Sequence, residues 1–319
     1  PTSLCATLPP SGSSWRWPGS RKRRIELQVI ESARNCAVRA YKECVARGIP
    51  GLVPLEGFRI VEDALHAGAA LETLYLAEEV AASAAGRRLA ELARRRGADV
   101  IIVSEGVAKR MADTQSPQGV FATAAWAPLE GASVLAEAAK GGEPSFIVLL
   151  DGISDPGNLG TIVRAAAALG AAGVVAGPGC AGFANPKVVR ASMGSIFRIP
   201  AARSDRLDDL ANQARMCDYD IIVSDVRKGI SADELAWPRP DSMRAILAVG
   251  SEARGVSEAL CRYATAWVKL DMSRDVESLN AASAASILIY ILSRKAALWR
   301  SHGEGRSAQG SETGPTRGE

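Results

Sequence analysis

The feature that most constrains this chain is a series of short apolar runs that alternate with helical segments between residues 145 and 299. Strands are expected at 146–150, 174–176, 196–199, 220–223 and 246–249, and helices at 161–169, 186–193 and 206–215. Uninterrupted apolar runs bounded by turn residues suit strands that are covered on both faces. The alternation therefore predicts a parallel α/β domain with helices on both faces of the sheet and right-handed crossovers.

The last part of this pattern, residues 246–292, predicts a ligand-binding loop followed by the helix that supports it. The run 246–249 leads into Gly250, where the lack of a side chain permits close approach. A second apolar run at 268–272 leads into an acidic loop, and a helix with a wide apolar face is expected at 279–298. Ser278 and Asn280 stand where that helix begins, and either could cap it.

A smaller α/β domain is expected ahead of this one. Its predicted elements are helices at 24–47, 58–67 and 86–96 and strands at 51–57, 73–76, 100–103 and 119–123. The whole chain then divides into a disordered extension at 1–23, a first domain at 24–126, a linker at 127–144, a second domain at 145–299 and a disordered tail at 300–319. The extension is compatible with a transit peptide or with a basic tail that touches RNA.

Composition narrows the functional classes. Hydrophobic residues make up 47% and charged residues 23%, as in globular proteins, and the net charge of +3 is a weak indication of a polyanionic partner. The six cysteines form no Cys-x-x-Cys pair, and neither of the two histidines lies near a nucleophile motif, which argues against a zinc site and against Ser–His hydrolysis. No apolar run approaches a membrane span of about 20 residues, and residues 284–292 are expected to belong to a short helix.

One motif points to a different class of enzyme. Residues 177–182 (GPGCAG) match the Gly-x-Gly-x-x-Gly pattern of dinucleotide-binding folds. In those folds the third glycine lies inside a helix, whereas Pro186 favours a helix that starts only there. We interpret the motif as a turn and keep an NAD-linked enzyme as a minor alternative.

Three segments carry a resemblance to a known family. Residues 155–166 (DPGNLGTIVRAA), 185–195 (NPKVVRASMGS) and 250–255 (GSEARG) with 278–280 (SLN) resemble the three motifs of the SpoU (TrmH-like) class of RNA ribose methyltransferases in the SPOUT superfamily. The family usually has proline where this chain has Asp271. In the first domain, residues 55–57 (LEG) and 116–119 (SPQG) resemble the ribosomal-protein-like substrate-binding domain of many members. The resemblance implies a parallel-sheet α/β knot, S-adenosylmethionine as cofactor, no metal, and a homodimer.

The resemblance also implies site residues. Those expected to hold the cofactor are Gly250, Glu252, Leu270, Met272 and Leu279. Those expected to take part in catalysis are Arg164, Asn158, Ser278 and Asn280. Because arginine stays protonated at ordinary pH, Arg164 suits the orientation of a phosphate and the stabilisation of an alkoxide rather than the role of a base. For Asn280, helix capping is the competing explanation.

The sequence therefore predicts a cytoplasmic, homodimeric enzyme that methylates the ribose 2′-hydroxyl of structured RNA. The added first domain favours ribosomal RNA over transfer RNA. Candidate phosphate contacts are Arg34, Arg39, Lys42, Arg47, Lys109 and Arg110. Arg190 and Arg198 are plausible RNA contacts or salt-bridge partners. The alternatives are a transfer RNA 2′-O-methyltransferase and a non-catalytic RNA-binding or ribosome assembly factor with the same fold.

Overall fold

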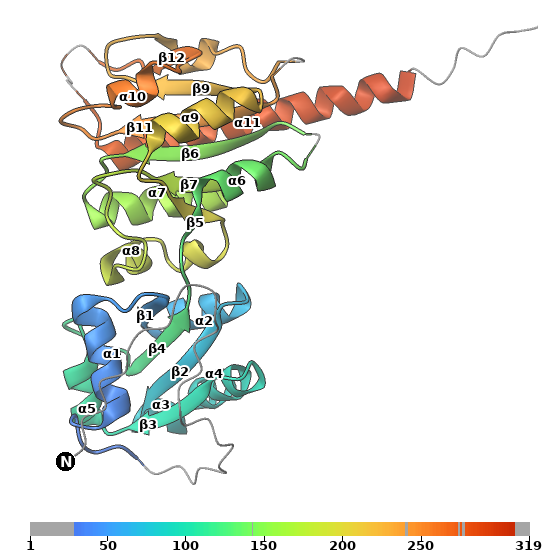
Figure 1. Ribbon diagram of the computed structural model, residues 1–319. Coiled ribbons are helices and arrows are strands. Elements are labelled where there is room, and N and C mark those ends of the chain that lie inside the picture. Colours follow the sequence, from blue (N-terminus) through green and yellow to red (C-terminus); the bar gives the residue numbers. More distant parts are fainter. Residues whose placement is uncertain (1–28, 142, 240–241, 274, 276–277, 310–319) are drawn as a thin grey trace, which may run out of the picture.

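The computed structural model describes residues 29–309 apart from 142, 240–241, 274 and 276–277, with side chains described as far as Ser301. The extension expected at 1–23 and the end of the tail expected at 300–319 lie outside these residues. Two α/β domains are stacked end to end, with the smaller, N-terminal one at the bottom of Figure 1. A small α/β domain ahead of a parallel-sheet α/β domain is the predicted architecture. The threading of the last helix into a knot stays a prediction.

The first domain is a four-stranded sheet with helices on both faces. Its strand order is β1 (Leu52–Glu56), β4 (Val120–Ala125), β2 (Ala70–Ala77) and β3 (Asp99–Val103). Its helices are α1 (Cys36–Arg47), α2 (Phe58–His66), α3 (Glu78–Ala82), α4 (Ala84–Arg95) and α5 (Glu105–Met111). Side chains alternate along β2, so that Leu74 and Leu76 pack in the core with α2 and α4, while Tyr75 packs with α1 and α5.

The first helix is shorter than the sequence pattern predicted. A helix was expected over 24–47, but α1 begins at Cys36. The Asn35 side chain accepts a hydrogen bond from the Ala37 amide at 2.9 Å and so caps the helix there. Upstream, Ile30 forms a parallel bridge with Val103 at the edge of the sheet. Capping and strand pairing thus satisfy backbone groups that a longer helix would have used.

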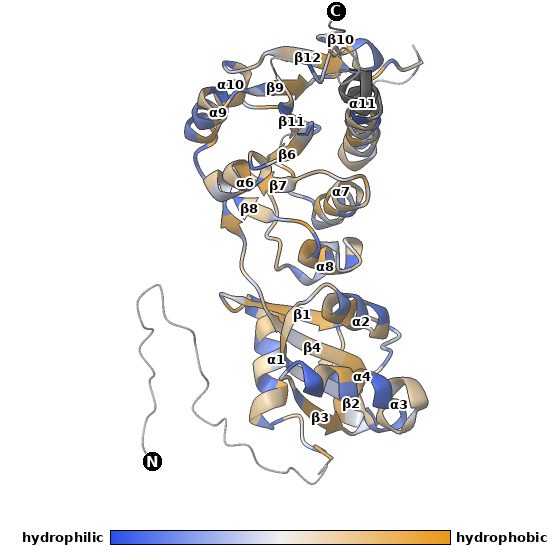
Figure 2. Ribbon diagram, turned by 90° about the vertical axis from the view of Figure 1, so that its right-hand side faces the viewer, coloured by the Kyte–Doolittle hydropathy of each residue, from blue (hydrophilic) through white to orange (hydrophobic). Residues whose placement is uncertain are grey.

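The second domain is an eight-stranded sheet in which every neighbouring pair is parallel. Its strand order is β10 (Ile230–Ser231), β12 (Ala266–Lys269), β9 (Tyr219–Ser224), β11 (Arg244–Gly250), β6 (Ser145–Asp151), β7 (Gly173–Ala176), β8 (Ala201–Arg203) and β5 (Leu129–Glu130). Helices α6 (Gly131–Ala138), α9 (Leu207–Met216) and α10 (Glu258–Cys261) cover one face, and α7 (Pro156–Ala168) and α11 (Ala281–Gln309) cover the other (Figure 2). The predicted two-faced α/β sheet is confirmed.

Two local predictions in this domain were wrong. Residues 127–144, expected to be a linker, contain β5 and α6, and α6 buries Val134 and Leu135 against the sheet. The strand expected at 196–199 is a 3₁₀ turn, η1 (Ser195–Phe197), and β8 begins only after Pro200. Ile196 and Ile199 are both buried, and a separation of three residues suits one face of a helical turn rather than of a strand.

The last helix is longer than expected. α11 runs for 29 residues and extends beyond the rest of the domain, as the red helix of Figure 1 shows. Its part Ala281–Ser301 is long and apolar enough to cross a membrane by length and composition, so the expectation of a short helix was wrong. Core helices of globular domains pass the same test, and Leu288, Ile289 and Leu292 of α11 are buried against the sheet and α7.

Candidate active site at the carboxyl ends of the strands

A pocket of about 420 Å³ lies at the carboxyl ends of β9, β11 and β12, beside the first turns of α11. Parallel α/β sheets bind ligands at this edge. Residues from the predicted cofactor and catalytic groups that line it are Gly250, Glu252, Leu270, Met272, Leu279 and Ser278. Further apolar lining comes from Val249, Val268, Ala281, Ala284 and Leu288. The structure therefore gathers the whole predicted cofactor set around one cavity.

The loop after β11 requires glycine at its first position. A Cβ atom on Gly250 would lie 2.0 Å from the carbonyl carbon of Gly255, which no side chain can tolerate. The loop is closed by a 2.7 Å hydrogen bond from the Gly255 amide to the Ser251 carbonyl oxygen. It is further held by Asp151, a buried residue at the end of β6, whose carboxylate accepts a hydrogen bond from the Ser257 amide at 2.8 Å.

Glu252 ties this loop to the start of α11. Its Oε1 accepts a hydrogen bond from the Ala281 amide at 2.8 Å and another from the Asn280 side chain at 3.3 Å. A carboxylate at this position also interacts favourably with the positive end of the helix dipole. Glu252 thus anchors one wall of the pocket to another.

Asn280 serves two purposes at once. Its Oδ1 accepts hydrogen bonds from the amides of Ala282 at 2.9 Å and Ser283 at 3.3 Å, which caps α11. Its Nδ2 donates to the Asn158 side chain at 3.1 Å. The two explanations weighed for this residue are therefore compatible, because each uses a different end of the amide.

Asn158 lies in the first turn of α7. The helix is capped by Asp155, whose carboxylate accepts a hydrogen bond from the Asn158 amide at 2.7 Å. Asn158 is partly exposed and, like Arg164, does not line the pocket. Its contact with Asn280 nevertheless joins α7 to the pocket wall.

Arg164 stands apart from this cluster. Its side chain is exposed on α7 and forms no hydrogen bond or ion pair with the residues that the structure describes. The geometry thus brings Asn158, Glu252 and Asn280 together and leaves the guanidinium of Arg164 available for an external anion.

The loop after β9 was missed as part of the site. Ser224, Asp225, Val226 and Arg227 line the pocket, together with Arg254 and Lys269. The Asp225 carboxylate accepts hydrogen bonds from the amides of Arg227 and Lys228, each at 2.8 Å, which fixes the loop. The signal was present in the sequence, because the strand at 220–223 was predicted and the segment after it lies at the ligand-binding edge.

The pocket fits an S-adenosylmethionine molecule in size and chemistry. Ligand pockets for such molecules measure roughly 300–1,000 Å³ and combine apolar walls with a few charged groups. Here leucine, valine and alanine walls accompany the carboxylates of Asp225 and Glu252 and the cations of Arg227, Arg254 and Lys269. Within the described part of the chain, no group of three or more His, Cys, Asp or Glu side chains could hold a metal ion.

Comparisons with known proteins agree with this geometry. Residues 145–290 match the model of the SpoU rRNA Methylase family, and residues 54–128 match that of the RNA 2′-O ribose methyltransferase substrate binding domain. The 23S rRNA (guanosine(2553)-2′-O)-methyltransferase RlmP of Bacillus subtilis is 30% identical over 269 residues, covering 83% of this chain and 99% of the relative. The TrmH family tRNA/rRNA methyltransferase YacO of the same organism, a putative assignment, is 30% identical over 75% of this chain and 94% of its own.

Solved structures of RNA methyltransferases also resemble this chain. The S-adenosylmethionine-bound rRNA methyltransferase from Sinorhizobium meliloti superposes with a TM-score of 0.73 at 26% identity, over 84% of this chain and 97% of its own. The SpoU methyltransferase AviRb from Streptomyces viridochromogenes, also with the cofactor, gives 0.70 at 25% identity, over 82% and 98%. Fold and pocket thus define an RNA methyltransferase that uses S-adenosylmethionine. The chain belongs to the SpoU rRNA Methylase family, which confirms the resemblance seen in its motifs.

This assignment also accounts for the dinucleotide-like motif. Residues 177–182 form a loop after β7, and helix α8 (Pro186–Ala191) begins at Pro186 with Asn185 as its cap. The motif is a turn, as predicted, and the NAD-linked alternative is abandoned.

Proposed function

We propose that the protein methylates a ribose 2′-hydroxyl in ribosomal RNA and that the residues predicted from the motifs carry out the reaction. The observation that carries the assignment of residues is the hydrogen-bonded bridge from Asn158 through Asn280 to Glu252, which joins α7 to the wall of the cofactor pocket. The match over nearly the whole length of a 23S rRNA methyltransferase supports the choice of ribosomal over transfer RNA.

In this proposal Gly250, Leu270, Met272 and Leu279, which line the pocket, would hold the cofactor. When bound, it supplies a methyl group on a positively charged sulfur. The apolar walls keep water from that centre, and Glu252 and Asn280 hold the loop and the helix that form the walls.

The polar residues act on the RNA. Asn158, Asn280 and Ser278 orient the ribose, since Ser278 lines the pocket and the hydrogen-bonded amides of Asn158 and Asn280 lie beside its wall. Arg164 pairs with the adjacent phosphate and stabilises the negative charge that develops on the ribose oxygen as the hydroxyl proton passes to solvent water. Its lack of a partner among the described residues supports this role.

The first domain grips the RNA. Its candidate phosphate contacts, Arg34, Arg39, Lys42, Arg47, Lys109 and Arg110, are all exposed. They belong to α1, α5 and the segment before α1, and Figure 1 shows both helices on the same side of the molecule as the start of α11. Phosphate contacts there would hold a structured RNA across both domains.

We further propose that the enzyme works as a cytoplasmic homodimer. α11 exposes Ile287, Tyr290 and Leu298, large apolar side chains that a second copy of the chain would cover. Sedimentation of the purified protein tests this. A monomer at micromolar concentration would contradict it.

The test of the function is transfer of label from radioactive S-adenosylmethionine to unmodified ribosomal and transfer RNA pools, followed by digestion to nucleosides. We expect label in one 2′-O-methylnucleoside from ribosomal RNA. Label confined to transfer RNA would refute the proposed substrate. Cofactor binding without transfer to either pool would favour the non-catalytic RNA-binding factor.

A further inference from the structure

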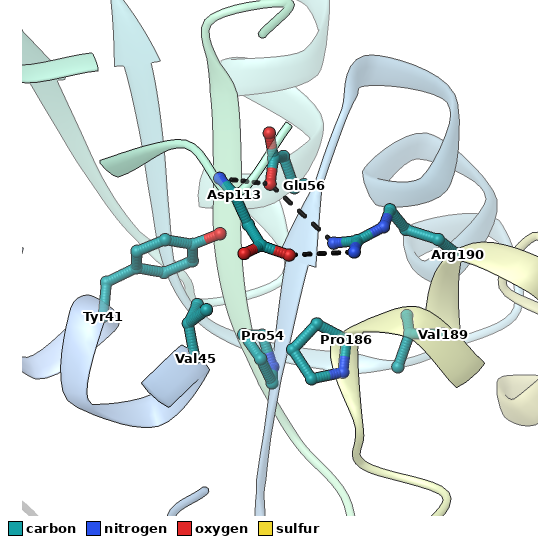
Figure 3. A pocket seen from close by; sticks show the side chains of 8 residues that line it. All are labelled: Tyr41, Val45, Pro54, Glu56, Asp113, Pro186, Val189 and Arg190. Carbon is teal, nitrogen blue, oxygen red and sulfur yellow. Dashed lines mark hydrogen bonds and ion pairs between the residues drawn. The ribbon is translucent and has the colours of Figure 1, made fainter. Parts of the chain in front are cut away.

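The two domains meet at an ion-pair cluster formed by Arg190 of α8 and two carboxylates of the first domain (Figure 3). The Arg190 guanidinium lies 2.9 Å from the Asp113 carboxylate and 4.0 Å from that of Glu56. Pro54 and Pro186 also line this junction, which encloses a cavity of only about 10 Å³. The domains are therefore in close contact at this point.

The cluster is only partly removed from water. The Glu56 side chain is 5% exposed, that of Arg190 26% and that of Asp113 44%. Charge pairs that are shielded from solvent are weakened less by salt than pairs on the open surface, so the buried carboxylate of Glu56 makes this contact less sensitive to salt than a pair between two exposed side chains.

Glu56 does not depend on Arg190 for its burial. Its carboxylate accepts hydrogen bonds from the amides of Asp113 at 3.0 Å and Thr114 at 3.3 Å, and from the Thr114 hydroxyl. These three donors lie within the first domain and satisfy the buried charge locally. Arg190 is thus an addition from the other domain, and removing it leaves the first domain with its own network.

A second contact reinforces the first. Arg198, which follows η1, lies 3.1 Å from Asp63 of α2, and Gly194 packs its backbone against the same helix. The segment 185–198 therefore presents two cations to two separate acidic points on the first domain. Two separate contacts fix the orientation of the two domains as well as the distance between them.

The same segment packs closely against α7, so that the backbones of α7 and α8 are in contact. A Cβ atom on Gly160 of α7 would lie 2.5 Å from the Val188 carbonyl oxygen and 2.6 Å from the Ala191 Cβ, both in α8. Since α7 carries Asn158 and Arg164, a movement of α8 with the first domain would be transmitted to α7. Close-packed elements transmit such shifts rather than absorb them.

We propose that Arg190 is a positioning residue that sets the RNA-binding domain relative to Asn158 and Arg164. The proposal rests on the function proposed above, because its purpose is to present an RNA held by one domain to the chemistry of the other. Of the two expectations for Arg190 and Arg198, RNA contacts or salt-bridge partners, the structure supports the second, because carboxylates of the first domain pair with both side chains.

Two exposed cysteines allow the domain arrangement to be measured directly. Cys36 begins α1 in the first domain and Cys217 follows α9 in the second. In a Cys5→Ser, Cys261→Ser background, spin labels on these two positions report the distance distribution between the domains. The variants are Arg190→Met, Arg190→Lys and, as a matched control, Arg206→Met, which removes exposed ion pairs to Asp208 and Asp209 within the second domain.

We expect Arg190→Met to broaden the distance distribution and to lower kcat on ribosomal RNA by roughly tenfold or more, since misplacement by about 1 Å can cost a factor of about 100. Cofactor affinity should stay unchanged. Arg190→Lys keeps the charge and should recover a narrow distribution and most of the turnover. Arg206→Met should match the parent protein in both measurements.

An unchanged distance distribution in Arg190→Met would overturn the proposal, as would a lysine variant no better than the methionine variant. A defect confined to KM or to cofactor binding would also overturn it, because misalignment acts on bound RNA. If the parent protein transferred no methyl group to any RNA, the proposed function would fail, whereas the distance distributions would still decide the part played by Arg190.

Discussion

The side-chain nitrogen of Asn280 lies 3.1 Å from the side-chain oxygen of Asn158, although 122 residues separate them in the chain. The contact joins the start of α11 to the start of α7, so two helix termini meet beside the pocket. Because the oxygen of the Asn280 side chain caps α11 and its nitrogen contacts Asn158, substitutions at Asn280 can separate the stability of the helix from the geometry of the site.

Asn280→Ala should lose both functions of the side chain. Loss of an N-cap costs about 1 kcal/mol, so Tm should fall by a few degrees, and transfer should fall with it. Asn280→Ser keeps a capping oxygen but cannot reach Asn158, and should hold Tm near that of the parent protein while transfer still falls. Thermal unfolding and turnover measured on both variants check this. Full turnover in the serine variant would show that the bridge is dispensable.

Arg164→Ala should abolish transfer and leave the rest of the protein intact. The side chain is exposed and without a partner among the described residues, so its removal should change stability by less than about 0.5 kcal/mol. Calorimetric titration with S-adenosylmethionine should give the affinity of the parent protein. If turnover persisted, the phosphate and alkoxide role would belong to another residue.

Gly250→Ala should weaken cofactor binding. Even one methyl group would collide with the backbone of Gly255, so the loop that forms a pocket wall must move. Gly182→Ala is the matched control, since a Cβ there meets nothing within 4 Å. Binding of S-adenosylmethionine to both variants measures the difference. Equal affinities would mean that the cofactor lies elsewhere.

Stability should decline at alkaline pH through buried tyrosines. Burial raises the pKa of Tyr75 and of Tyr219 to about 12, and raises that of Tyr41 well above its usual value, with a further contribution from the charge of Glu56. A phenol whose pKa is higher in the folded than in the unfolded chain stabilises the fold fully below about pH 10. That contribution, about 3 kcal/mol for each of Tyr75 and Tyr219, is lost as the pH rises toward 12. Denaturant unfolding between about pH 8 and pH 11, with tyrosinate absorbance followed in parallel, should show the decline only in the upper part of this range. A decline that begins near neutrality would point to other groups.

Much of the fold was predictable because parallel strands that are buried on both faces appear in the sequence as uninterrupted apolar runs. The run 146–150 is apolar on both faces since Phe146, Val148 and Leu150 pack with α7 and α11, while Ile147 and Leu149 pack with α6 and α9. The prediction failed for segments in which apolar and polar residues do not form a clear pattern. α6 is short and alanine-rich, lies among glycines and prolines, and gains its stability from packing on the sheet, so composition alone resembled a linker.

The candidate site was predictable where sequence motifs mark it and not where tertiary structure creates it. Gly250 and Glu252 were found because residues 250–255 resemble a motif of the family, and Gly250 also bounds a loop that follows a predicted strand. Asp225 was missed because its neighbours match no motif, and its place at the pocket depends on β9 lying beside β11 and β12. The pairing of Arg190 with Asp113 depends on how the two domains pack against each other, which local periodicity does not encode.

Because α11 is long, one of its ends lies at the cofactor pocket and the other lies outside the domain. A rise of about 1.5 Å per residue places its ends roughly 40 Å apart, with Asn280 and Glu252 at one end and the other beyond the body of the domain. A reporter group attached near the far end of α11 would therefore lie well away from the cofactor pocket. That end is a natural attachment point for following the enzyme on its RNA without disturbing the chemistry.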